Sequence, residues 1–144
     1  MDAFESRFRV RSHELDALGH VNHAVYLNYF EQARYDALEA AGLPVRDLAE
    51  KKSAGVYVVR IEVDYRRECL FGQRLRVLTW VETFRGSSMI VRQELYREAD
   101  EPDEGPAAEA RVVVVWVGER GRPARIPEEV RRGLSSPPTS SRTS

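Results

Sequence analysis

One long helical pattern followed by four strand patterns restricts the fold of this chain more than any other feature of its sequence. Apolar or small residues recur at three- and four-residue spacing across residues 23–41, which is typical of an amphipathic helix. The four strand patterns are residues 57–66, which alternate with period two, and residues 75–84, 89–96 and 108–117. Short polar connections separate the last three patterns and favour antiparallel hairpins.

The predicted helix carries recognisable signals at both ends. Asn22 is a good N-cap, because its side chain can accept a hydrogen bond from an unpaired N–H of the first turn. Gly42 stands where helices commonly end in a left-handed residue, and Pro44 prevents the helix from continuing. The sequence therefore predicts one long helix with defined bounds.

Two further segments complete the predicted order of elements. Residues 4–12 alternate like a half-buried strand, and residues 127–134 suit a short closing helix. This order predicts an α+β domain in which a five-stranded antiparallel sheet wraps one long central helix. Residues 112–117 are apolar on both faces, so we expect the helix to cover one face and a second protomer to cover the other.

The length and charge of the chain limit the kinds of protein it can be. Its 144 residues suit one domain, which we place at residues 1–134, with a disordered tail rich in Ser, Thr and Pro at 135–144. A net charge of −1, from 22 basic and 23 acidic residues, argues against a nucleic-acid surface. Without a signal peptide or an apolar run of membrane-spanning length, we expect a cytoplasmic protein with no membrane partner. The lone Cys69 excludes an internal disulfide, and we expect it to be a small buried side chain.

The residues best suited to chemistry lie just before the predicted helix. All three histidines, His13, His20 and His23, fall within eleven residues that also contain Asp16. A helix start presents unpaired N–H groups and a partial positive charge, so it can hold a carbonyl oxygen as negative charge develops there. These four side chains also suit zinc in type, although two of them lie at a loop-to-helix junction and not four apart on one helical face. Asp16 could equally close an Asx turn.

The segment from Asp16 to Arg34 resembles the signature of a known family. Its sequence, Asp-Ala-Leu-Gly-His-Val-Asn-His-Ala-Val-Tyr-Leu-Asn-Tyr-Phe-Glu-Gln-Ala-Arg, is similar to that of the hotdog-fold acyl-CoA thioesterases in the 4-hydroxybenzoyl-CoA thioesterase-like branch. The strand at 61–67, a turn at Gly72 and the hairpin at 85–88 follow in the order of that family. The resemblance implies a hotdog fold and hydrolysis of an acyl-CoA to a carboxylic acid and CoA.

The resemblance also implies roles for particular residues. Asp16 acts on the thioester, either as a nucleophile that forms a mixed anhydride or as a base that activates water, and the sequence leaves both routes open. The backbone N–H of His23 donates to the thioester carbonyl oxygen, and the His23 side chain could orient the water or steady the aspartate. The expected substrate-binding residues are Asn22, Tyr26, Arg85, Ser87 and Ser88.

The family pattern also implies what the chain binds. We expect an acyl-CoA substrate, no metal, no other cofactor, and a homo-oligomer such as a dimer of dimers, that is, a homotetramer. The alternatives are an acyl-ACP thioesterase, whose substrate presents the same thioester on acyl carrier protein, and an acyl-CoA-binding protein without turnover. On the helix, Glu31 and Arg34 lie three residues apart and are expected to pair with one another, with no catalytic role.

Overall fold

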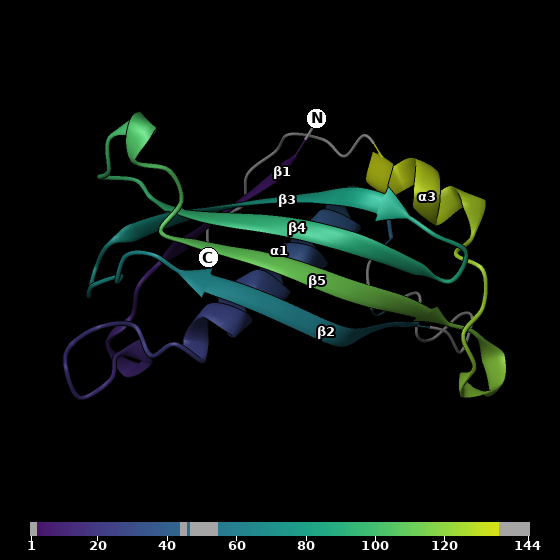
Figure 1. Cartoon of the computed structure of the whole chain (residues 1–144), viewed down its shortest axis with the longest axis horizontal. Coiled ribbons are helices and arrows are strands. Elements are labelled where there is room, and N and C mark those ends of the chain that lie inside the picture. Colours follow the sequence, from purple (N-terminus) through teal and green to yellow (C-terminus); the bar gives the residue numbers. More distant parts are fainter. Residues whose placement is uncertain (1–2, 44–45, 47–54, 136–144) are drawn as a thin grey trace.

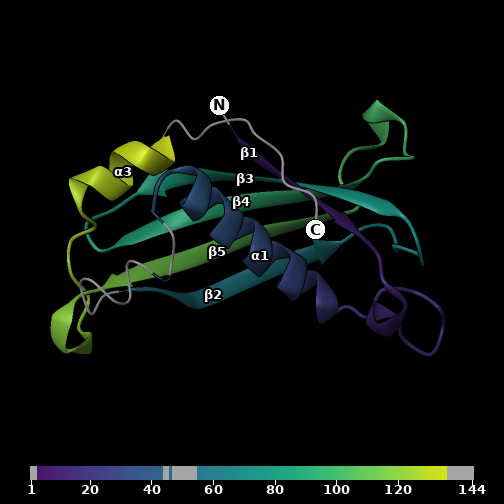
Figure 2. The ribbon, with the colours of Figure 1, turned by 180° about the vertical axis from the view of Figure 1, so that it is seen from behind.

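A single antiparallel sheet with one helix across its face makes up most of the molecule (Figures 1 and 2). The structure is a computed structural model and describes residues 3–43, 46 and 55–135. No helix within these described ranges is long and apolar enough to cross a membrane. The elements in chain order are β1 (Phe4–Arg9), η1 (Ser12–Glu14), α1 (Val25–Ala40), β2 (Gly55–Tyr65), β3 (Arg74–Phe84), β4 (Ser88–Arg97), η2 (Pro102–Glu104), β5 (Ala108–Val117), η3 (Glu119–Gly121) and α3 (Glu128–Ser135).

The sheet confirms the five predicted strands, although the first of them ends at Arg9 and not at residue 12. The strand order is β1-β3-β4-β5-β2, and every pair is antiparallel. β3, β4 and β5 form the expected hairpins, but β2 pairs with β5 and not with β3, which pairs with β1 instead. The connector between β2 and β3 crosses the end of the sheet and is bonded to the loop before α1, where the N–H of Val21 donates to the carbonyl of Cys69 at 2.9 Å.

α1 packs on one face of the sheet through aromatic and small side chains (Figure 2). Phe30 and Ala33 have no exposed surface, and small residues such as Ala33 let the helix lie close to the strands. Along β5 every second side chain is buried in the same core. These β5 residues are Ala108, Ala110, Val112, Val114 and Trp116. The predicted alternation therefore corresponds to an inner face that meets the helix.

The helix is slightly shorter than predicted at its start. It begins at Val25 and not at residue 23, and its N-cap position is Ala24, which already has helical dihedral angles. Asn22 caps the preceding turn instead: its Oδ1 accepts a hydrogen bond from the N–H of Ala24 at 2.9 Å. An asparagine side chain satisfies an N–H two residues on as readily as one in a first helical turn, so the cap was predicted two residues early. At the other end, Gly42 has the predicted positive φ, at 79°.

The C-terminal part of the described chain closes one end of the sheet. α3 lies where a short helix was predicted, and Val130 and Leu134 bury their side chains in the core. Ser135, assigned from the sequence to a disordered tail, is the last residue of this helix. The rest of that predicted tail, residues 136–144, lies outside the described residues.

A buried glutamine links the helix to the sheet. Gln93 of β4 has no exposed surface, and its amide Nε2 donates to the carbonyl of Phe30 at 2.8 Å and to Oγ1 of Thr79 at 3.0 Å. Its Oε1 accepts a hydrogen bond from Nη1 of Arg34 at 3.0 Å. Because a buried amide is costly unless its donors and acceptor are paired, this network fixes where α1 lies along the strands.

We expect Phe30→Ala to lower the free energy of unfolding by roughly 3–5 kcal/mol, because it leaves a cavity where a fully buried ring was. The measurement is urea unfolding followed by circular dichroism. Leu27→Ala on the same helix is the control, since Leu27 is 37% exposed and its loss removes less buried surface. Equal losses for the two variants would contradict this description of the core.

Candidate active site

A hollow of about 250 Å³ lies at the N-terminal end of α1, and several of the predicted site residues line it together. It is formed by the loop before the helix, the first turn of the helix, the end of β2 and the connector that follows. Its lining residues are Asp16, His20, Val21, His23, Tyr26, Tyr65, Arg66, Arg67 and Glu68. The structure therefore brings together Asp16, His23 and Tyr26, which the sequence placed in one site.

The loop that carries Asp16 is closed by its own hydrogen bonds. The backbone N–H of Asp16 donates to the carbonyl of His20 at 2.7 Å, and Gly19 between them has a φ of 82° that suits glycine. Oδ1 of Asp16 accepts from the N–H groups of Leu18 at 2.9 Å and of His20 at 3.1 Å. The Asx turn considered from the sequence thus exists, and it holds the carboxylate at the edge of the hollow.

The same contacts set the charge of Asp16. The hydrogen bond from the His20 N–H lowers the pKa of the Asp16 carboxyl, and the Leu18 N–H adds to this against a smaller opposing effect of burial. Asp16 is therefore ionised at neutral pH. No hydrogen bond from a described residue reaches its second oxygen, Oδ2, which leaves that atom available to a ligand or a water.

The turn before α1 presents an unpaired backbone donor beside this carboxylate. The N–H of Val25 donates to the carbonyl of Asn22 at 2.8 Å and the N–H of Ala24 to the Asn22 side chain, so both are used. Within the described ranges, no acceptor lies in hydrogen-bonding position to the N–H of His23. His23 itself is exposed, and its carbonyl accepts from the Tyr65 hydroxyl at 2.8 Å. An N–H free of partners at a helix start can donate to a carbonyl oxygen.

Aromatic rings form one wall of the hollow. The ring of Tyr65 lies edge-on to Tyr26 at 5.1 Å and to His23 at 6.4 Å between centroids. The Tyr26 hydroxyl accepts from the N–H of Cys69 at 3.2 Å, and burial raises the pKa of that hydroxyl. Cys69 is fully buried, as predicted. Tyr65 was not predicted as a site residue, because it lies 42 residues from His23 and only the sheet brings it here.

A buried carboxylate beneath the loop holds it in place. Glu14 is 5% exposed, and its Oε1 accepts from the N–H of Arg11 at 2.7 Å and from the Tyr29 hydroxyl at 2.8 Å. Its backbone carbonyl accepts from the N–H of Asn22 at 2.9 Å, which ties this turn to the start of the helix. Burial raises the pKa of Glu14, but the hydrogen bonds and the charge of Arg11 outweigh it and lower the pKa overall. Glu14 was not predicted as a site residue.

The predicted site residues Arg85, Ser87 and Ser88 lie elsewhere in the protomer. They form the hairpin between β3 and β4, near α3 and at the opposite end of the sheet from η1 (Figure 1). Main-chain bonds brace this hairpin, among them Arg85 N–H to Ser88 carbonyl at 2.7 Å and Trp116 N–H to Ser87 carbonyl at 2.7 Å. One protomer alone therefore does not unite them with Asp16, and their role in binding stays a prediction.

Charged side chains that line the hollow form ion pairs or hydrogen bonds with other residues. Arg66 pairs with Glu109, Arg67 bonds Asp100 through its Nε at 3.1 Å, and Nδ1 of His20 lies 3.0 Å from Oε2 of Glu68. His13 is exposed in η1, outside the lining of the hollow. Across the part of the chain that the structure describes, no three His, Cys, Asp or Glu side chains lie together as metal ligands would.

Comparison with known proteins shows that the chain is similar in sequence and fold to thioesterases. The profile of the thioesterase-like superfamily matches residues 10–134. The long-chain acyl-CoA thioesterase FadM of Escherichia coli is 30% identical over 113 residues, which are 78% of this chain and 82% of FadM. The chloroplastic acyl-acyl carrier protein thioesterase ATL2 of Arabidopsis thaliana is 27% identical over 127 residues, 88% of this chain but 65% of ATL2. The chain thus spans less than two thirds of that plant relative. The crystal structure of a probable thioesterase from Bartonella henselae superposes with a TM-score of 0.79 at 25% identity, covering 87% of this chain and 99% of the other.

We expect Glu14→Gln to destabilise the protein at neutral pH and less so in acid. The folded-state pKa of Glu14 is lowered, so the folded chain binds fewer protons than the unfolded chain. The stabilisation from the carboxylate is thus present above the unfolded pKa and is lost as pH falls through the folded pKa. Urea unfolding of wild type and variant across pH 3–7, a range of about four units around the usual glutamate pKa, measures this.

Glu82→Gln is the matched control, since the Glu82 carboxylate pairs with Arg92 at an exposed site. Its effect on the free energy of unfolding should stay within about 0.5 kcal/mol. A Glu14→Gln effect that is as small, or that does not change with pH, would show that the buried carboxylate does not hold the loop.

Proposed function

This chain belongs to the thioesterase-like superfamily and has its hotdog fold, and we propose that it hydrolyses an acyl-CoA to a free carboxylic acid and CoA. One observation carries the proposal: the ionised Asp16 and His23 line a single hollow, and neither Oδ2 of Asp16 nor the N–H of His23 has a hydrogen-bond partner among the described residues. A carboxylate and an N–H donor are the two groups needed to activate a water and to stabilise a thioester oxyanion.

In the proposed reaction the thioester carbonyl oxygen accepts a hydrogen bond from the His23 N–H. The positive end of α1 adds to this stabilisation as negative charge develops on the oxygen. Oδ2 of Asp16 takes a proton from a water whose oxygen forms the new bond to the carbonyl carbon. When the tetrahedral intermediate collapses, the carbon–sulfur bond breaks and the CoA thiolate leaves, taking up the proton held by Asp16.

A second route uses the same atoms in another order. Oδ2 of Asp16 would attack the carbonyl carbon directly, the carbon–sulfur bond would break and the CoA thiolate would leave, which gives a mixed anhydride of the acyl group with Asp16. Water then attacks the anhydride, releases the carboxylic acid and the Asp16 carboxylate, and supplies the proton that the thiolate takes up. We favour the base route, because the hollow of about 250 Å³ leaves space for a water between Asp16 and the thioester carbonyl. The His23 side chain, exposed at the rim, would help to orient that water.

Acyl carrier protein is a close alternative to CoA as the carrier of the acyl group. FadM acts on long-chain acyl-CoA, whereas ATL2 acts on acyl groups carried by acyl carrier protein. We propose acyl-CoA as the substrate and expect side-by-side assays of one acyl group on both carriers to favour CoA. Affinity for acyl-CoA without turnover would instead indicate a binding protein.

We further propose that the protein is a homo-oligomer, with a dimer of dimers as the expected form. β2 lies at an edge of the sheet and exposes Tyr57, Val58 and Val59, and such an edge is prone to pair with another strand. On the face of β5 away from α1, Val113 and Val115 are only half-buried and suit a second contact. In such an assembly, Arg85, Ser87 and Ser88 of one protomer would bind the CoA portion at the hollow of another.

We expect Asp16→Asn to lower kcat/KM for acyl-CoA by at least about a hundredfold, since it removes the proton acceptor but keeps the shape of the side chain. Release of free CoA, with a panel of acyl-CoA substrates, measures it. His13→Ala is the matched control, because His13 is exposed outside the hollow, and should leave kcat/KM within about twofold. A fully active Asp16→Asn enzyme would overturn the proposed role.

We expect Val59→Lys to shift the protein to a smaller species in sedimentation-velocity experiments, because it places a charge at the exposed edge of β2, where Val59 is 61% exposed. Phe71→Lys is the control: Phe71 is 63% exposed, but in the connector after β2. A wild-type protein that sediments as a monomer would contradict the proposed oligomer without bearing on hydrolysis.

A further inference from the structure

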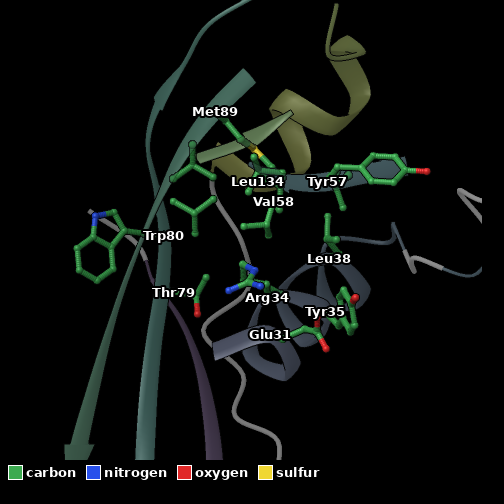
Figure 3. A pocket seen from close by; sticks show the side chains of 15 residues that line it. Glu31, Arg34, Tyr35, Leu38, Tyr57, Val58, Thr79, Trp80, Met89 and Leu134 are labelled. Carbon is green, nitrogen blue, oxygen red and sulfur yellow. The ribbon is translucent and has the colours of Figure 1, made fainter. Parts of the chain in front are cut away.

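A second and larger cavity lies between the C-terminal half of α1 and the sheet, separate from the hollow at the helix start. Its volume is about 350 Å³, and no residue lines both spaces. Its walls are mainly aliphatic and come from the helix, four strands and α3 (Figure 3). They include Leu38, Val58, Val81, Met89, Val91 and Leu134. A cavity of this size and lining suits an apolar chain or ring.

One charged group projects into this apolar space. The guanidinium of Arg34 points from α1 toward the middle of the cavity, near Thr79 and Val58 (Figure 3). Its Nη1 donates to Oε1 of Gln93 at 3.0 Å, and Gln93 is itself fixed by Phe30 and Thr79. The buried glutamine thus holds the arginine in one orientation.

The other N–H groups of Arg34 have no partner among the described residues. The expected pair with Glu31 does not form, because no ion pair joins the two side chains in the described ranges; Glu31 is exposed at the rim and acts on the guanidinium only through its charge. The described residues also contain no fully buried side-chain nitrogen without a hydrogen-bond partner. The free nitrogens of Arg34 therefore open onto the cavity.

It costs free energy to keep the guanidinium of Arg34 charged in this apolar space without an anionic partner. Removal from water disfavours the charged form, so burial lowers the pKa of the Arg34 guanidinium, with the nearby Glu31 carboxylate opposing the effect. A carboxylate in the cavity would offer both charge and paired acceptors to the planar fork of the guanidinium. An uncharged aliphatic ligand would contact the apolar walls of the cavity but would leave the N–H donors of Arg34 without an acceptor.

We propose that this cavity binds an apolar chain that ends in a carboxylate, with Arg34 as its anchor. Two sources carry that chemistry: a free carboxylic acid, and the distal carboxylate of an acyl group that is still attached to CoA. Arg34 lies eleven residues after His23, about 16 Å along the helix, so an acyl group whose thioester lies at the helix start would have to span about that distance to reach Arg34. The second source rests on the proposed hydrolysis, whereas the first does not.

Calorimetric titration with octanoate and with octan-1-ol tests the cavity without reference to turnover. We expect wild type to bind octanoate about tenfold or more tightly than the alcohol, as a charge-assisted hydrogen bond predicts. Arg34→Met should abolish that preference and Arg34→Lys should keep part of it. Equal affinity for the two ligands, no binding of octanoate, or an unchanged preference in Arg34→Met would overturn the proposal.

Val81→Trp gives a second test that leaves Arg34, Gln93 and the exposed edge of β2 in place. Val81 lines the cavity from β3 and is only partly buried, so a larger side chain can enter the space. It should weaken binding of octanoate by at least about tenfold while the fold and Asp16 stay unaffected. Undiminished binding in this variant would place the ligand elsewhere and refute the proposal.

Kinetics then distinguish the two sources. Dodecanoyl-CoA is compared with the CoA monothioester of dodecanedioic acid, which differs only in its distal carboxylate. A lower KM for the second substrate in wild type, lost in Arg34→Met at similar kcat, indicates the distal end of the acyl group. If wild type binds octanoate but shows no such difference in KM between the two substrates, the ligand of the cavity is a free carboxylic acid. If no thioester is hydrolysed, the proposed function is wrong, but the calorimetric result still decides whether the cavity binds a carboxylate.

Discussion

The site depends on the hydrogen bonds that join the loop before α1 to the connector after β2. Val21 donates to Cys69, Cys69 donates to the Tyr26 hydroxyl, and His20 forms a bridge with Leu70. These bonds hold the helix start against the end of the sheet. They therefore fix the loop that carries Asp16 and His23 relative to the connector that leads from β2 to β3.

Periodicity predicted the elements of the fold well, because it reports which face of an element is buried. The alternation in β5 and the three- and four-residue spacing in α1 both correspond to faces of the observed core. It could not predict that β2 lies next to β5, since a period of two is the same for any neighbour. Asn22 shows a similar limit. A side chain that can cap a helix can also cap a turn, and only the backbone angles of the following residues show which of the two it caps.

The candidate site divides in the same way between local and distant contacts. Asp16, His23 and Tyr26 lie within eleven residues, so a sequence signature could identify them together. Tyr65, Glu14 with its partner Tyr29, and the bond from Arg34 to Gln93 depend on tertiary packing. A signal existed for Glu14, because a tyrosine on the inward stripe of a helix needs an acceptor for its hydroxyl. None existed for the 59-residue separation of Arg34 and Gln93.

The burial of Cys69 has a practical consequence for work on this protein. It is the one cysteine of the chain, it has no exposed surface, and burial raises the pKa of its thiol. A thiol that is neither ionised nor accessible reacts slowly with disulfide reagents such as Ellman's reagent. The folded protein therefore contributes little background in a colorimetric assay, and the signal reports the thiol released in solution.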